Sequence, residues 1–250
     1  MNIFFTLFRR ELGGYFSSLN GYVIISSALV LVGACFSDLV VRLNTHPTDM
    51  TLPTMFFSSW YFWLIMLLSS PLITMRSFAK EKSNGTYETL MTAPVNDWQV
   101  LMSKFCGALF FYAMIWMPVM FSMLILRMYI DNALIVSIPG VFTSYFGVLV
   151  VGMLYMAIGC FSSAVTKSQI VAGMLSFTLG MGVFMLGYRS FFENTETNQL
   201  VELMSRLSVA AYVEECSRGI IDTRPLLFAL TLTFFFLFVT YQVLQRRRWK

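Results

Sequence analysis

The sequence predicts an all-α polytopic membrane protein, and three observations carry this prediction. Hydrophobic residues make up 57% of the 250-residue chain and charged residues only 12%, whereas a soluble domain carries about 25% charged residues. Six segments are apolar over the ~20 residues that a helix needs to cross the hydrocarbon core. They lack the alternation of barrel strands, and only helices or closed barrels satisfy the backbone in lipid.

The chain is expected to form a single transmembrane domain over residues 1–250. Residues 1–20 should form an amphipathic interfacial helix, with Arg9 and Arg10 on its polar side. Six spans follow: Gly21–Val41, Met55–Met75, Phe105–Leu126, Ile138–Ser162, Ile170–Tyr188 and Leu226–Leu244. The domain is therefore divided as 21–75 (spans one and two), 76–104 (an inner loop), 105–188 (spans three to five), 189–225 (an outer segment) and 226–250 (span six and a basic tail).

The distribution of Lys and Arg predicts that both termini are cytoplasmic. With the N-terminus inside, the inner segments hold eleven basic residues and the outer segments six. Cytoplasmic loops of membrane proteins carry such an excess.

The inner loop 76–104 is the most informative stretch. Four residues after Gly85 have the spacing i, i+3, i+4 and i+7: Tyr87, Leu90, Met91 and Pro94. This spacing predicts a short amphipathic helix over about 85–93, with Glu88 complementing its N-terminus. Pro94 should end the helix because it lacks an N–H and disfavours helix at the preceding residue.

A second helix should begin at Asn96, with Gln99 three residues on, and continue through Trp98 into the third span. From the residues alone, the loop is either an amphipathic segment lying on the inner leaflet or a docking element for a cytoplasmic partner.

The outer segment 189–225 is acidic, and two short helices are expected in it. Five of its residues share one helical face: Leu200, Leu203, Met204, Leu207 and Ala211. The second helix should end before Gly219, which is a suitable C-terminal cap.

Charged residues avoid the centres of all six spans, which argues against a proton- or sodium-driven carrier. Three pairs with i, i+4 spacing lie instead at the outer ends: Asp38 with Arg42, Arg127 with Asp131, and Arg189 with Glu193. They are either interfacial anchors or an exit ring for a charged substrate. The chain has no phosphate-binding loop motif, so it is not expected to be an enzyme, and any ATPase must be a separate polypeptide. No catalytic, cofactor-binding or metal-binding residue is expected.

Two sets of residues within the spans leave alternatives open. Met114, Met117, Met120 and Met123 recur on the third span, where thioethers could pass Cu(I) or simply pack. On the fifth span, Ser176, Gly180 and Gly187 are a candidate dimer face, and the alternative is contact within the same chain.

One ordered set of motifs resembles a known family. It consists of Glu81-Lys82-Ser83-Asn84-Gly85-Thr86-Tyr87-Glu88-Thr89-Leu90, then Ala93-Pro94-Val95, Trp98 and Lys104. This set resembles the loop after the second helix in the ABC-2 family of ABC-transporter permeases, and the six spans, inward termini and surface helix agree with it. The run 218–224 and the basic end 245–249 look most like the gliding-motility-type branch.

The resemblance implies the permease subunit of an ATP-binding cassette exporter in the bacterial cytoplasmic (inner) membrane. Its partners would be a separate ABC ATPase in two copies, which binds ATP and Mg, and a second permease, identical or related; it contacts membrane lipid and no nucleic acid. The ATPase-coupling residues would be Glu81, Gly85, Thr86, Tyr87, Glu88, Leu90, Met91, Pro94 and Trp98. Two alternatives remain: a non-transporting membrane anchor of a motility or envelope machine, and a methionine-lined copper conduit.

Overall fold

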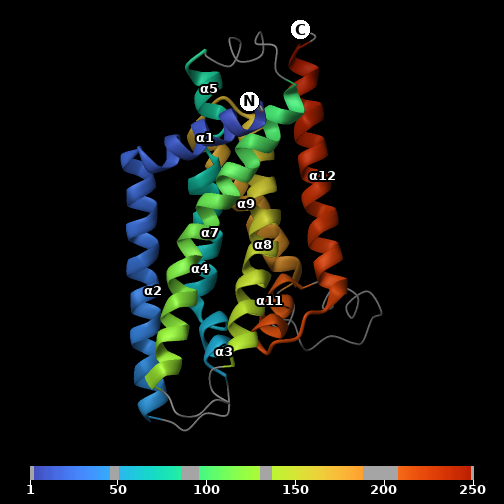
Figure 1. Ribbon diagram of the computed structural model, residues 1–250. Helices are drawn as coiled ribbons and strands as arrows, with labels where there is room; N and C mark the ends of the chain where they lie inside the picture. Colours follow the sequence, from blue (N-terminus) through green and yellow to red (C-terminus); the bar gives the residue numbers. More distant parts are fainter. Residues whose placement is uncertain (1–2, 46–50, 86–95, 130–136, 188–207, 249–250) are drawn as a thin grey trace.

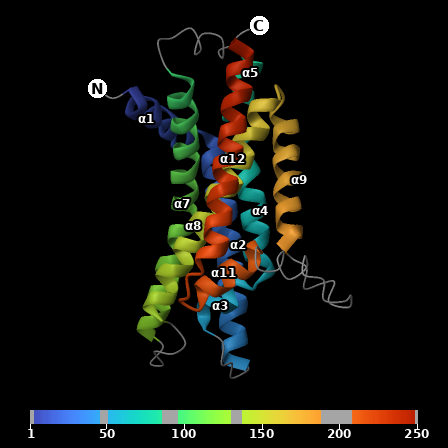
Figure 2. The same ribbon diagram turned by 90° about the vertical axis from the view of Figure 1, so that its right-hand side faces the viewer.

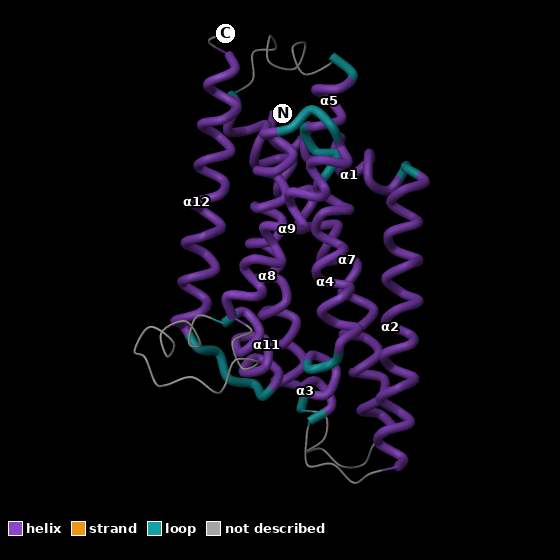
Figure 3. Tube along the Cα trace, turned by 180° about the vertical axis from the view of Figure 1, so that it is seen from behind, coloured by secondary structure: helices purple, strands orange, loops and turns teal. Residues whose placement is uncertain are grey.

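The computed structural model describes residues 3–45, 51–85, 96–129, 137–187 and 208–248, and every regular element in these ranges is a helix. The helices are α1 (Ile3–Phe16), α2 (Leu19–Thr45), α3 (Leu52–Phe57), α4 (Trp60–Thr74), α5 (Ala79–Ser83), α7 (Asp97–Tyr129), α8 (Ile138–Val165), α9 (Gln169–Gly187), α11 (Val209–Ser217) and α12 (Thr223–Arg248). The predicted all-α fold class is confirmed for the described residues, as the tube in Figure 3 shows.

Five stretches are long and apolar enough to cross a membrane. They are α2, α7, α8, α12 and the run from Trp60 to Ser83 that includes α4 and α5. The fifth predicted span, Ile170–Tyr188, corresponds to α9, which is a shorter apolar helix. The chain is therefore a multi-pass helical membrane protein by length and composition, with five candidate spans among the described residues where six were expected.

The second expected span, Met55–Met75, is wrong at its start. The helix is interrupted at Ser58 and Ser59, between α3 and α4. The Ser59 hydroxyl accepts a hydrogen bond from the Phe62 N–H at 3.4 Å. A serine in this position caps a new helix by satisfying one of its free N–H groups. The hydropathy of the segment hides this break because the surrounding residues are apolar on both sides of it.

The helix α8 lies at the centre of the bundle and contacts α4, α7, α9, α11 and α12. Two glycines allow the neighbouring helices to approach closely. Gly152 faces the ring of Tyr112 on α7, and Gly159 faces the side chain of Thr74 on α4. Small residues at helix contacts are the usual means of close packing between membrane helices.

Both chain termini lie at the same end of the bundle (Figure 1). At this end α1 crosses the bundle, and α5 and the last turns of α12 lie beside it; we call it the α1 end. The helices α3 and α11 lie at the opposite end, the α11 end. Seen from the side, α9 runs along α4 and α8 (Figure 2).

Candidate functional site

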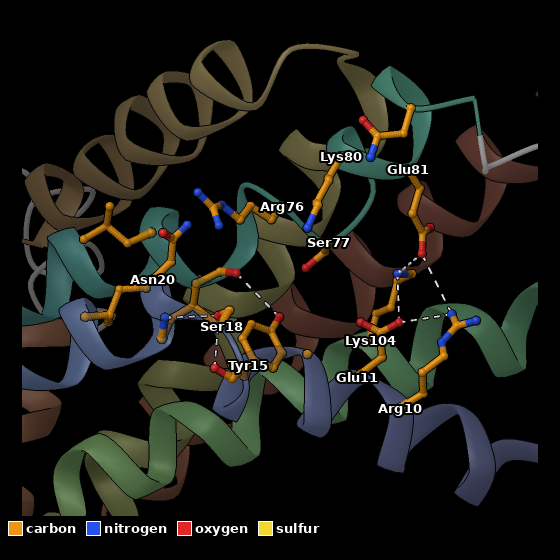
Figure 4. Close-up of a pocket in the computed structure, with 16 residues that line it drawn as sticks. Arg10, Glu11, Tyr15, Ser18, Asn20, Arg76, Ser77, Lys80, Glu81 and Lys104 are labelled. Carbon is orange, nitrogen blue, oxygen red and sulfur yellow. Dashed lines mark hydrogen bonds and ion pairs between the residues drawn. The ribbon is translucent and has the colours of Figure 1, made fainter.

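A buried lysine marks the α1 end of the bundle. Lys104, two turns into α7, has a side chain only 2% exposed, and its ammonium group lies between two carboxylates. Its Nζ is 3.1 Å from Glu11 Oε1 of α1 and 2.8 Å from Glu81 Oε1 of α5 (Figure 4). The same ammonium lies 5.3 Å from the centre of the Phe78 ring. Lysine is almost never fully buried unless it is paired in this way.

A second cation completes this group. Arg10 Nη2 lies 3.3 Å from Glu11 Oε1 and 3.8 Å from Glu81 Oε1. We call Arg10, Glu11, Glu81 and Lys104 the charged junction. Its two cations balance its two carboxylates, and it joins three helices that are far apart in sequence: α1, α5 and α7.

A serine of α8 ties the start of α5 to the bundle. The Ser163 hydroxyl accepts hydrogen bonds from the N–H groups of Phe78 and Ala79, both at 3.0 Å. Lys82 Nζ donates to the Ala164 carbonyl, also at the end of α8. Ser163 therefore acts as an N-terminal cap supplied by another helix, and it fixes α5 to α8.

The helix α5 ends where the predicted coupling helix should begin. The Asn84 N–H donates to the Lys80 carbonyl at 3.1 Å, and Gly85 follows with φ of +73°. This left-handed conformation favours glycine after a helix, so Gly85 ends α5. The remaining residues of the predicted coupling helix lie outside the described residues: Thr86, Tyr87, Glu88, Leu90, Met91 and Pro94.

The chain resumes at the start of α7, and here the predicted start at Asn96 is confirmed. The Asn96 side-chain oxygen accepts from the Trp98 N–H at 3.3 Å, and the Asn96 carbonyl accepts from the Gln99 N–H at 2.9 Å. The Trp98 ring packs edge-on against Tyr241 of α12, with 5.6 Å between ring centres. The described residues on both sides of segment 86–95 thus pack on the bundle.

The comparison with protein families agrees with this arrangement. Residues 20–210 match the family described as ABC-2 family transporter protein. This chain belongs to the ABC-2 transporter family. The match runs from α2 to the start of α11, which is most of the chain, and leaves α1, most of α11 and all of α12 outside. A search of curated proteins finds no match. The protein is thus an ABC transporter permease, the membrane component of its transporter, and such permeases generally work with an ABC ATPase subunit.

Of the three charge pairs predicted for the outer ends of the spans, the structure describes both residues of one. Arg42 Nε lies 3.0 Å from Asp38 Oδ2 on the exposed surface of α2. Asp131, Arg189 and Glu193 lie outside the described residues, so the other two pairs stay predictions.

The candidate dimer face of the permease makes contacts within the chain. Ser176 is 2% exposed, and the Gly180 carbonyl accepts a hydrogen bond from the Tyr155 hydroxyl of α8 at 3.3 Å. The side-chain environment of Gly187 is outside the description. At Ser176 and Gly180 the structure therefore shows packing within the same chain, which was the alternative to a dimer face. A role in dimerisation stays a prediction.

The methionines of α7 do not line one surface of the permease. Met114 and Met117 are 40% and 42% exposed, whereas Met123 is buried in the core. A step of three residues turns around a helix of 3.6 residues per turn. The packing role is the one that this placement supports.

Three residues of the site were missed by the motif-based prediction: Glu11, Lys104 as an ion-pair partner, and Ser163. Lys104 had one local signal, because it is a charge directly before the apolar run 105–126. The contact of Glu11 with Lys104 and the cap by Ser163 had none, since the partners are 93 and 84–85 residues apart.

Proposed function

We propose that this permease is the transmembrane subunit of an ATP-driven exporter in a bacterial cytoplasmic membrane. The observation that carries the proposal is the attachment of segment 86–95. One of its ends follows α5, which Ser163 and the charged junction hold, and the other begins α7, where Trp98 packs on α12. A segment held at both ends transmits a force applied by a docked protein.

In this proposal the α1 end faces the cytoplasm, and the chain crosses the membrane six times, with α9 as the fifth crossing. An even number of crossings agrees with two termini at the same end of the bundle. ATP and Mg are bound by the ATPase subunits, in two copies, and a second permease completes the transporter. The C-terminal region resembles that of the gliding-motility-type branch, and we propose that the permease belongs to this branch.

The ATPase acts on the bundle through short, direct contacts. Closure of the ATPase displaces segment 86–95, and α5 passes this displacement to α8 through Ser163, to α7 through Lys104 and to α1 through Glu11. Because α5 has only five residues, it moves with the segment as one rigid turn. The displacement of segment 86–95 thus reaches α8, α7 and α1.

Purification of the native complex tests this function. We expect an ABC ATPase to co-purify with the permease, and we expect Leu90→Asp or Glu88→Ala to leave membrane insertion intact while uncoupling ATP hydrolysis from transport. Lys167→Gln, an exposed cation between α8 and α9, is the matched control. Purification without any nucleotide-binding subunit, or normal coupling in both variants, would overturn the proposal.

A reconstitution experiment distinguishes the exporter from a membrane anchor that moves no solute. The purified complex is placed in proteoliposomes, and ATP-dependent movement is measured for polysaccharide, lipid, peptide and drug substrates. The exporter moves one of these classes when ATP is supplied. ATP hydrolysis with no movement of any class would favour the anchor.

A further inference from the structure

A cleft of about 290 Å³ opens beside the charged junction, between α1, α2 and α4. Its polar lining comes from both sides of the bend that joins α1 to α2, from the turn between α4 and α5, from α5 and from Lys104 of α7 (Figure 4). The cleft lies at the α1 end, at the level where the apolar stretches of α2 and α4 meet charged residues. The charged junction, which the proposed coupling path uses, forms part of the lining of the cleft.

The cleft carries an excess of positive charge. Its lining includes four cations, Arg10, Arg76, Lys80 and Lys104, and two carboxylates, Glu11 and Glu81, which gives a net formal charge of 4 − 2 = +2. Arg10 and Lys104 lie against the two carboxylates. The excess therefore belongs to Arg76 and Lys80.

Neither of these two cations meets a carboxylate in the described parts of the chain. With the Asn20 amide oriented so that its oxygen faces α4, this oxygen accepts from the Arg76 guanidinium. Within the same residues, the Lys80 ammonium has no hydrogen-bond or ion-pair partner. Figure 4 shows the Lys80 ammonium turned toward Ser77 and the Arg76 guanidinium turned toward Asn20.

A buried hydroxyl adds a donor at the same place. Ser77 is 6% exposed and borders the cleft, and within the described residues its hydroxyl faces the Tyr15 hydroxyl without a hydrogen bond of normal length. A buried polar group without a partner is uncommon and calls for a ligand or water. Two cations and one hydroxyl together suit the oxygens of a phosphate group, which accept charge-assisted hydrogen bonds.

The other wall of the cleft is apolar. Ile24 of α2 and Leu72 of α4 line it, and Leu72 keeps 38% of its surface exposed. A ligand that fills the cleft therefore has an anionic head beside an apolar chain. Basic pockets between membrane helices commonly hold such lipid headgroups.

We propose that this cleft binds an anionic phospholipid, with its phosphate group between Arg76, Lys80 and Ser77 and its acyl chain along Ile24 and Leu72. The bound lipid ties the bend between α1 and α2 to the end of α4. Because α1 carries Glu11 of the charged junction, the lipid also supports the position of the junction. The proposal does not depend on which substrate the permease moves.

Binding of phosphatidylglycerol to the detergent-purified permease, measured by native mass spectrometry, tests the proposal. We expect the double variant Arg76→Gln/Lys80→Gln to bind about thirtyfold more weakly, at roughly fivefold for each cation. The control Arg9→Gln/Lys167→Gln removes two exposed cations from the same end without touching the cleft, and it should bind as the wild type does. Equal weakening in both double variants would overturn the proposal.

A single variant and two comparison ligands complete the experiment. Lys80→Gln removes a side chain without a described partner, so it should fold normally and still bind about fivefold more weakly; unchanged binding would count against the site. Phosphatidylcholine and inorganic phosphate are compared as ligands in the same assay. Weak binding of both supports an anionic lipid, whereas displacement of phosphatidylglycerol by inorganic phosphate would show that the cleft takes free phosphate instead.

Discussion

At the scale of single residues, the buried ammonium of Lys104 is the contact on which the α1 end most depends. It is only 2% exposed, whereas its partners Glu11 and Glu81 keep 17% and 21% of their side-chain surface. Such a group contributes little when intact, because desolvation offsets most of the attraction. Its removal is costly, because two carboxylates are left without their buried cation.

We expect Lys104→Met to destabilise the protein by about 3 kcal/mol, at the low end of the range for breaking a buried pair, because both carboxylates are partly exposed. Thermal unfolding in detergent measures the change. Lys167→Met, at an exposed position of the same end, should unfold as the wild type does. Equal unfolding temperatures for the two variants would contradict the importance given to Lys104.

Glu215 of α11 gives the protein a pH dependence with a definite sign. Burial raises the pKa of this carboxyl, Asp222 and Glu214 raise it further, and Arg218 opposes them. The folded state then holds the proton more tightly than the unfolded state, so its stability falls as pH rises from the ordinary glutamate pKa, about 4.3, through the raised value.

Glu215→Gln should therefore stabilise the protein at pH 7 and leave its stability at pH 4 unchanged. Thermal unfolding at the two pH values measures this difference. Glu214→Gln is the matched control on the same helix, where Glu214 forms an exposed pair with Arg218 at 2.7 Å. If Glu215→Gln were no more stable than the control at pH 7, the ionised Glu215 carboxylate would not destabilise the folded protein, and the explanation would be wrong.

Local residue features could be predicted from the sequence, and distant ones could not. The start of α7 at Asn96 and the pair of Asp38 with Arg42 depend on residues two to four positions apart. Gly219, with φ of +84°, ends α11 as predicted, because its neighbours in sequence decide the cap. The charged junction depends instead on the packing of α1 and α5 against α7, which no short motif encodes.

At the scale of helices, the contact between α8 and α4 sets the geometry of the bundle. A methyl group added at Gly159 would overlap the side chain of Thr74, which belongs to α4. Thr74 is fully buried and donates to the Ser70 carbonyl at 2.8 Å, so it has little freedom to move. The two helices can adopt this spacing only with a glycine at position 159.

We expect Gly159→Ala to destabilise the protein by about 1–3 kcal/mol through overpacking. Gly33→Ala on α2 is the control, since no atom lies within 4 Å of the added methyl group there; it should be neutral or stabilising by up to about 1 kcal/mol. Unfolding in detergent compares them. A Gly159→Ala protein as stable as Gly33→Ala would mean that the close approach is not required.

The positions of the helices along the chain could be predicted better than which helices lie at the centre of the bundle. Lipid forces each long apolar run into a helix, so α2, α7, α8 and α12 cover their predicted spans. Their mean hydropathies are nearly equal, from 2.0 to 2.2, yet the apolar window of α8 is 78% buried and those of α2 and α12 are 22% buried. Hydropathy does not separate a central helix from a peripheral one, because lipid and protein interior are both apolar.

At the scale of the whole molecule, the charges and the termini divide the bundle into two unlike ends. The α1 end holds the charged junction, the basic cleft and the described residues that flank segment 86–95. The α11 end holds short helices and the exposed pair of Asp38 with Arg42. This asymmetry leads to the central claim that the ATPase docks at the α1 end, on segment 86–95.

Site-specific photo-cross-linking tests this claim most directly. A photoreactive amino acid replaces Leu90 in one variant and Ile220, which is 60% exposed at the α11 end, in another, and the cross-linked products are identified in native membranes. The account predicts a covalent product with an ABC ATPase from position 90 and none from position 220. No ATPase product from position 90, or an ATPase product from position 220, would contradict it.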